Sequence, residues 1–211
     1  VDFVLTGPAE YVVFAKLTDA KPVVGWQRPD YFAQIVVMAE GPIKSLADLK
    51  GKKVAFGEVG STSQQLGPAQ VLADAGLKYG TDYGVEIIKR NVAVEAMIRG
   101  DVQAVGMNMT HLRSIREKFP GQKFAVVGRG PDLPNDILIA ASSVPAGTVE
   151  KVKKAFLENG EALMGGVLKG EDTKKYEGGF FLAQVNDKDY DGVRAMYATV
   201  GAAEFSNFLG E

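Results

Sequence analysis

A strand, a glycine loop and the first turn of a helix follow one another in residues 56–64, FGEVGSTSQ. The N-terminus of a helix carries unsatisfied N–H groups and about half a positive charge, so Ser61, Thr62 and Ser63 would add hydroxyls to a neutral cradle for an oxyanion. A second interpretation is that Ser61 only caps the helix, with Gln64 completing a capping box. No Gly-Lys-Ser/Thr follows the loop, which argues against a nucleotide-hydrolysing phosphate loop.

Strands and helices alternate on both sides of this segment. The predicted strands are residues 1–5, 22–26, 31–39, 53–56, 85–88, 102–105, 123–127 and 137–141, and the predicted helices are 9–17, 45–51, 64–75 with a kink at 67–68, 92–99, 110–119, 146–168 and 190–208. Strands that alternate with helices of about 10 to 15 residues are typical of βαβ units with parallel sheets. The sequence therefore predicts an α/β fold.

The composition is that of a folded globular protein without cysteine chemistry. The chain has 211 residues, 46% of them hydrophobic and 24% charged, which suits one large domain or two small ones. Its net charge of -2 provides no field for nucleic acid, so we expect no nucleic-acid partner. With no Cys, one His and no GxSxG elbow, we expect no metal site, no cofactor and no enzyme activity.

No stretch of the sequence is long enough to cross a membrane. The longest apolar runs, 11–15 and 35–39, are about five residues long, whereas a spanning helix needs about 20. The chain begins inside a strand-like run with no Met. We expect it to be truncated at its N-terminus, so that the lack of a signal peptide does not exclude export.

The glycine loop and its surroundings resemble the phosphonate, phosphite and phosphate branch of the periplasmic solute-binding proteins of ABC transporters. The resemblance covers most of residues 1–145, and its residues are 29–32 (PDYF), 41–56 (GPIKSLADLKGKKVAF), the Ser-Thr-Ser loop, 99–104 (RGDVQA) and 134–136 (PND). The Ser-Thr-Ser loop is specific to this branch in such a context. The Asp-Leu-Lys-Gly stretch is common to many solute-binding proteins and indicates the fold only.

This resemblance implies a two-lobed clamp of the type II periplasmic-binding-protein fold, with an α/β sheet in each lobe. Lobe I would comprise residues 1–29 and 137–211 and be incomplete at its N-terminus. Lobe II would comprise residues 30–136, with hinge crossovers near 30 and 136. The ligand would lie in the cleft.

The resemblance also implies the ligand-binding residues. In the family the Ser-Thr-Ser at a helix N-terminus holds the phosphorus oxyanion, which here means Ser61, Thr62 and Ser63. A Tyr at the first crossover corresponds to Tyr31, and an Asp at the second corresponds to Asp136. Taken singly, Tyr31 suits a hinge aromatic and Asp136 suits a turn residue, but their joint occurrence at both crossovers favours binding roles.

Two positions depart from the family pattern. Phosphonate binders often have a His in the strand-to-helix loop where this chain has Arg90-Asn91, and an acid at the helix start where it has Thr110-His111. Without the acid an ammonium group on the ligand would lack a partner, which argues against an aminoalkylphosphonate. Arg90 would either grip an anion through two hydrogen bonds or lie solvated at a strand end. Thr110 and His111 are further ligand-binding candidates.

Asp136 carries an expectation about the ligand. A carboxylate that faces a dianion in a dry cleft is repelled, so it contributes only where the ligand offers a protonated oxygen. This favours monoprotonated phosphite, phosphate or a small alkylphosphonate over sulfate, and does not separate the three.

The expected function is a monomeric, non-catalytic receptor, periplasmic or otherwise extracytoplasmic, that delivers a small anionic ligand to an ABC transporter permease. The alternative is the ligand-sensing input domain of a signalling protein with the same fold and a signalling partner. An enzyme would need a base within reach of its substrate, and a chain with one His and no Cys offers no convincing candidate. The fold alone does not choose between transport and sensing.

Overall fold

The computed structural model describes residues 1–204, without the side chain of Asp172. Its strands are β1 (Phe3–Thr6), β2 (Lys21–Trp26), β3 (Phe32–Met38), β4 (Lys53–Phe56), β5 (Gly84–Ile87), β6 (Ala104–Asn108), β7 (Phe124–Asp132), β8 (Asp136–Ala140) and β9 (Phe181–Leu182). Its α-helices are α1 (Pro8–Thr18), α2 (Gly67–Asp74), α3 (Arg90–Arg99), α4 (Met109–Lys118), α5 (Ala146–Glu158), α6 (Gly160–Val167) and α7 (Asp191–Thr199). The shorter helices are η1 (Leu46–Leu49), the π-helical η2 (Thr62–Leu66), η3 (Glu171–Tyr176) and η4 (Asp187–Tyr190).

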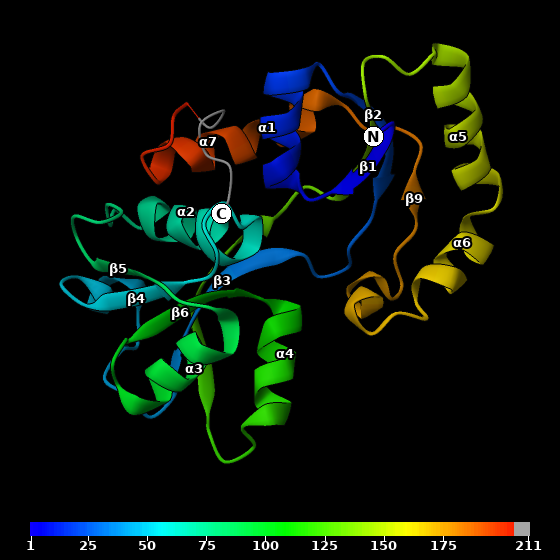
Figure 1. The fold of residues 1–211 in the computed structure, drawn as a ribbon. Coiled ribbons are helices and arrows are strands. Elements are labelled where there is room, and N and C mark those ends of the chain that lie inside the picture. The colour runs from blue at the N-terminus through cyan, green and yellow to red at the C-terminus, as the bar shows by residue number, and fades with distance from the viewer. Residues whose placement is uncertain (205–211) are drawn as a thin grey trace. The chain divides into compact units, whose positions relative to one another are not determined.

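These elements form two compact units (Figure 1). Unit 1 comprises Val1–Asp30 and Pro134–Arg194, and unit 2 comprises Tyr31–Leu133 and the described residues from Ala195 onward. The end of α7 belongs to unit 2, where the Thr199 hydroxyl lies 2.6 Å from the amide oxygen of Gln70 on α2. The chain therefore passes from one unit to the other after residues 30, 133 and 194.

The sheet of unit 1 has the order β1-β8-β2-β9 and is antiparallel in all its pairings, so the prediction of parallel sheets is wrong for this unit. β1, α1 and β2 do form the predicted strand-helix-strand unit, and α1 begins at Pro8, which suits a first helical position. β1 and β2 run in the same direction, but β8 lies between them and runs the opposite way. The pairing depends on a strand that follows about a hundred residues later in the chain.

The sheet of unit 2 has the order β5-β4-β6-β3-β7, and β4 is parallel to both β5 and β6. This part confirms the predicted βαβ units. β3 runs antiparallel to β6 and β7, which makes the whole sheet mixed.

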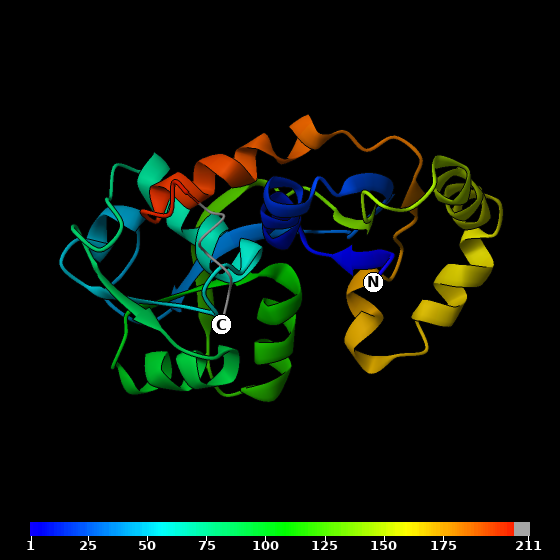
Figure 2. The ribbon, with the colours of Figure 1, turned by 45° about the horizontal axis from the view of Figure 1, so that its top comes forward.

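Alternate residues of these strands face two separate cores. Ile35, Val54 and Phe56 belong to the core under α2, whereas Val36 and Ala55 belong to the core under α3 and α4. Figures 1 and 2 show α3 and α4 together on one face of this sheet and α2 on the other. Helices therefore cover both faces, as a sheet with buried parallel strands requires.

Some element boundaries differ from the prediction. The helix predicted at 146–168 is interrupted at Asn159, which separates α5 from α6. The helix predicted at 190–208 ends at Thr199, and residues 205–208 of that prediction lie outside the described residues. η3 and β9 were not predicted. A two-residue strand such as β9 leaves no periodic pattern.

The carboxyl ends of the three parallel strands meet at one edge of the unit 2 sheet. β4 leads into the glycine loop and η2, β5 into α3, and β6 directly into α4. Ligands of α/β proteins commonly bind at this edge, where helix N-termini point outward.

Candidate functional site

Polar side chains gather where β4, β5 and β6 end. We call them the cradle, and its members are Ser61, Thr62, Ser63, Gln64, Arg90, Asn108 and His111. Except for Ser61 and Arg90, each is less than a tenth exposed. All of them belong to unit 2.

The glycine loop before η2 is held by two glutamines. The Gln65 amide oxygen accepts a hydrogen bond from the Gly60 N–H at 2.6 Å, and its amide nitrogen donates to the Tyr79 hydroxyl at 3.0 Å. Gly60 has a φ of +79°, a backbone conformation that favours glycine. A Cβ at Gly57 would collide with the Gln64 side chain. The loop is therefore fixed by contacts within the chain, as a preformed binding loop requires.

Ser61 does not cap the helix with its side chain. It stands at the N-cap position of η2, but only its carbonyl is used there, accepting from Gln65 and Leu66 N–H at 3.0 Å each. The interpretation of Ser61 and Gln64 as a capping box is thus wrong. Instead η2 opens with a wide π turn that runs straight into α2.

Asn108 connects two helix N-termini. Its amide nitrogen donates to the Ser63 hydroxyl at 3.0 Å, and its amide oxygen accepts from the His111 backbone N–H at 2.9 Å, which caps α4. Sequence analysis missed Asn108. The available signal was an Asn at the end of a strand and three residues before His111, the spacing of an N-cap.

Gly106 allows η2 and α2 to pack directly on β6. A Cβ at this position would lie 2.6 Å from the Pro68 Cβ and 3.1 Å from the Gln64 carbonyl oxygen. β6 continues past its predicted end at Val105, so that Gly106 lies inside the strand. A glycine inside a strand often marks a place where another part of the backbone comes close.

Arg90 is the first residue of α3 and reaches the cradle through Gln64. With the Gln64 amide oriented to satisfy both partners, its oxygen accepts from Arg90 Nε at 2.8 Å and from Nη2 at 3.0 Å. Arg90 is exposed overall, yet this pair of bonds fixes its guanidinium beside η2. A positive charge is therefore positioned at the edge of the cradle.

His111 lies in the first turn of α4 and is only 7% exposed. Neither ring nitrogen has a hydrogen-bond partner in the described part of the chain. Burial and, to a smaller extent, the nearby Arg90 guanidinium together lower the pKa of the ring to about 4. The ring is thus neutral at physiological pH. Its neighbour Thr110 is exposed.

A family model described as the ABC transporter phosphonate periplasmic substrate-binding protein matches residues 1–180. The chain belongs to this family. It is also similar to a protein of Prochlorococcus marinus solved in complex with methylphosphonate, with a TM-score of 0.71, 17% identity, and 96% of this chain and 79% of that chain covered. A binding component of an ABC phosphonate transporter from Pseudomonas aeruginosa gives a TM-score of 0.69 at 16% identity, covering 98% and 71%.

At these identities the structural likeness shows the fold, which is that of the type II periplasmic binding proteins and confirms the predicted fold class. The chain is also 40% identical, over 94 residues, to an Escherichia coli (strain K12) protein whose name describes the binding of aliphatic sulfonates. That match covers 44% of this chain and 28% of the relative's length. The family is thus one of periplasmic substrate-binding proteins, and the chain spans less than a third of the length of this curated relative.

The two residues predicted to lie at the crossovers belong to different units. Tyr31 is the first residue of unit 2, and it is buried, with its carbonyl accepting the Leu133 N–H at 2.8 Å. Asp136 opens β8 in unit 1 and is 3% exposed. Of the predicted ligand-binding residues, the structure gathers Ser61, Thr62, Ser63, Arg90 and His111 around the same strand ends.

Asp136 has several partners within unit 1. Its Oδ2 accepts from the Tyr176 hydroxyl at 2.5 Å and lies 3.6 Å from Lys175 Nζ, and its Oδ1 lies 3.4 Å from the Arg28 guanidinium. Tyr176 in turn packs against the Trp26 ring, with centroids 5.2 Å apart. The carboxylate therefore lies beside two cations of its own unit.

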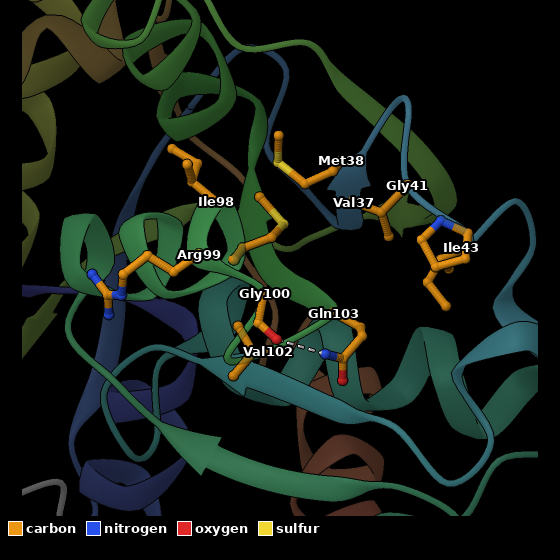
Figure 3. Close-up of a pocket in the computed structure, with 11 residues that line it drawn as sticks. Val37, Met38, Gly41, Ile43, Ile98, Arg99, Gly100, Val102 and Gln103 are labelled. Carbon is orange, nitrogen blue, oxygen red and sulfur yellow. Dashed lines mark hydrogen bonds between the residues drawn. The ribbon is translucent and has the colours of Figure 1, made fainter.

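A separate pocket of about 350 Å³ lies at the opposite end of the unit 2 sheet, where β3 ends and β6 begins. Figure 3 shows its apolar lining, with the Gln103 amide hydrogen-bonded to the Gly100 carbonyl and the Arg99 guanidinium pointing away from Val37 and Ile43. Most of the residues that line this pocket are apolar. Within residues 1–204 no group of three or more His, Asp or Glu side chains is placed to hold a metal ion.

Proposed function

We propose that this protein captures a small phosphorus oxyanion (phosphite, phosphate or a small alkylphosphonate) outside the cytoplasm and delivers it to an ABC transporter permease. The observation that carries the proposal is the cradle of unit 2. It combines buried hydroxyls at a helix N-terminus with a guanidinium that is already fixed in place.

The cradle supplies donors without much net charge. Hydroxyls of Ser61, Thr62 and Ser63 and the first N–H groups of the η2-α2 helix can donate to several oxygens of a tetrahedral anion. Because Asn108 and Gln64 fix these groups before the ligand arrives, little conformational freedom is lost on binding.

The remaining assignments rest on the sequence. Tyr31, Thr110 and Asp136 stay predicted ligand contacts, each described only within its own unit. For Asp136 we keep the expectation that it accepts a hydrogen bond from a protonated ligand oxygen, beside the bond it already accepts from Tyr176.

A small alkylsulfonate is a second candidate ligand, and the 40% identity with the Escherichia coli relative favours it. A sulfonate has the same tetrahedral oxygens as a phosphonate, but it carries one charge and no ionisable proton near neutral pH. The two classes therefore differ in charge and in hydrogen-bond donors, not in shape.

Calorimetry tests the proposal with protein that has been unfolded, dialysed and refolded to remove bound ligand. Methylphosphonate, phosphite, phosphate, ethanesulfonate and sulfate are titrated at pH 7 and fixed ionic strength. We expect at least one phosphorus oxyanion to bind tenfold more tightly than either sulfur oxyanion. Tighter binding of ethanesulfonate would replace the proposal with the sulfonate function.

The transport role needs a cellular measurement. Deletion of the gene should abolish uptake of radiolabelled ligand at low external concentration. Retained uptake, together with loss of a ligand-dependent transcriptional response, would support the sensing alternative instead.

A further inference from the structure

We propose that His111 takes up a proton from solvent when an oxyanion binds in the cradle, and that it holds the oxyanion as an imidazolium. This inference rests on the proposed function, because it concerns the same site. It assigns to His111 a change of charge when the ligand binds, and it narrows the class of ligand.

The first argument is the state of the ring in the structure. A buried polar group without a hydrogen-bond partner is costly, and such groups in native proteins call for an explanation. His111 is 7% exposed, and both its ring nitrogens lack a partner among residues 1–204. The Asn108 side chain, which could have satisfied the ring, is committed to the Ser63 hydroxyl and the His111 backbone N–H.

The second argument is the position of the ring. Asn108 links the His111 backbone to Ser63, so the residue lies at the start of α4, close to the N-terminus of η2. The Arg90 guanidinium, fixed on Gln64, is close enough to lower the pKa of the ring. An anion held between the hydroxyls and Arg90 would therefore lie near the ring as well.

The third argument is electrostatic. β3 and β6, against which α4 packs, contain no charged residue. α3 contains three charged residues, Arg90, Glu95 and Arg99. Glu95 pairs with Lys118 at the far end of α4, and Arg99 pairs with Asp101. Glu58 in the glycine loop is exposed, and the charged residues of α4 itself are Arg113, Arg116, Glu117 and Lys118. Arg90 is thus the charge that dominates the field at the ring.

An anion reverses that field. One negative charge about 4 Å from the ring, at an effective dielectric constant of about 20, is enough to move the titration midpoint up by about three pH units. Since the free ring has a pKa of about 4, the bound ring would then carry a proton close to neutral pH. Between the two midpoints, affinity rises up to tenfold for each pH unit that the solution is lowered.

The inference also restricts the ligand. An imidazolium and a guanidinium on the cradle, which contains no carboxylate, would repel an ammonium group close to the phosphorus atom. The class of ligand is therefore an oxyanion without an amino group near its acidic centre. Methylphosphonate should bind at least tenfold more tightly than aminomethylphosphonate at pH 6.5.

His111 is the single histidine of the chain, so its ring nitrogens give unambiguous NMR signals. The full chain, labelled with ¹⁵N-histidine, is titrated from pH 5 to pH 8 alone and with saturating methylphosphonate. We expect a neutral ring throughout without ligand, and a ring that titrates near neutrality with ligand. Calorimetry in buffers of different ionisation enthalpy should show proton uptake that is lost in His111→Gln and kept in Ser114→Ala, which changes an exposed residue of α4.

Two results would overturn the inference, and they are distinguishable. If methylphosphonate binds but moves the midpoint of His111 by less than one pH unit, the inference is wrong and the proposed function stands. If methylphosphonate, phosphite and phosphate all fail to bind, the proposed function falls and the inference falls with it. Equal affinity for aminomethylphosphonate would overturn the restriction on the ligand.

Discussion

The two units each contain a buried polar cluster, and the clusters are satisfied in opposite ways. In unit 1, Asp136 is surrounded by Arg28, Lys175 and the Tyr176 hydroxyl, so charge and hydrogen bonds close within the cluster. In unit 2, hydroxyls and amides bond one another around His111, whose ring nitrogens have no partner in the described residues.

This difference separates structural from ligand-binding polarity. Burying a polar or charged group is costly unless it is paired, so a cluster that closes on itself contributes to the stability of its own unit. A rigid cluster with an unpaired member can recover that cost from a ligand. Mutation of Asp136 in unit 1 should therefore cost stability as well as affinity, whereas mutations in the cradle of unit 2 should act mainly on affinity.

The largest effect is expected for Asp136→Ala. Removing the carboxylate from this buried cluster takes a negative charge away from both Arg28 and Lys175, which costs about 3 to 5 kcal/mol of unfolding free energy. Urea denaturation measures it. Asp132→Ala is the control, because its ion pair with Arg129 involves a side chain that is 81% exposed and should contribute less than about 1 kcal/mol. Equal losses in the two variants would break the comparison.

His111 should make the native state sensitive to acid. The folded ring has a pKa of about 4, below its ordinary value of 6.5, so the unfolded chain binds the proton first as the pH falls. Between pH 7 and pH 4 this lowers the unfolding free energy by about 3 kcal/mol. His111→Gln should lack this contribution, so urea denaturation at several pH values should show the stability of the wild type falling relative to that of the variant by about 3 kcal/mol between pH 7 and pH 4. Parallel curves would contradict the burial of a neutral ring.

Ser63→Ala should weaken ligand binding, and it should also lower stability somewhat because the buried Asn108 amide loses its acceptor. The substitution removes a buried hydroxyl from the cradle and the acceptor of Asn108, which is expected to cost about 1 to 3 kcal/mol, or roughly 5- to 150-fold in affinity. Calorimetry with methylphosphonate measures the change, and Ser114→Ala on exposed α4 surface serves as the matched control. Unchanged affinity in both variants would remove Ser63 from the site.

Arg90→Gln should have the smallest effect of the four. Because Arg90 is exposed, its attraction for an anion is screened, and we expect a loss of about 1 kcal/mol, close to fivefold in affinity. The variant should also bind with a weaker dependence on salt. An unaltered salt dependence would indicate that the guanidinium only anchors Gln64.

Much of the fold follows from local pattern, because strand and helix periodicity is a property of neighbouring residues. β4 was predicted with its observed bounds, and the kink at Gly67-Pro68 marks the change from η2 to α2. The antiparallel sheet of unit 1 was not predicted, since it depends on β8 inserting between β1 and β2 after the chain has passed through unit 2. No local signal carries that pairing.

The residues of the candidate site were likewise predicted where the signal is local and missed where it depends on distant parts of the chain. Ser61, Thr62 and Ser63 were predicted from one short segment that ends a strand and opens a helix. Gln64 and Asn108 were missed as cradle residues, because their partners, Arg90 and Ser63, lie more than twenty residues away in sequence. The neutral state of His111 depends on burial and on Arg90, neither of which the sequence displays.

Amide NMR of the full chain titrated with methylphosphonate tests the central claim most directly, namely that unit 2 holds the oxyanion at the ends of β4 and β6. We predict that the largest shifts in the unit 2 amides occur at residues 60–64 and 109–112. Binding without shifts at these two segments, or with the largest unit 2 shifts at the apolar pocket around Ile43 and Gly100, would contradict the claim.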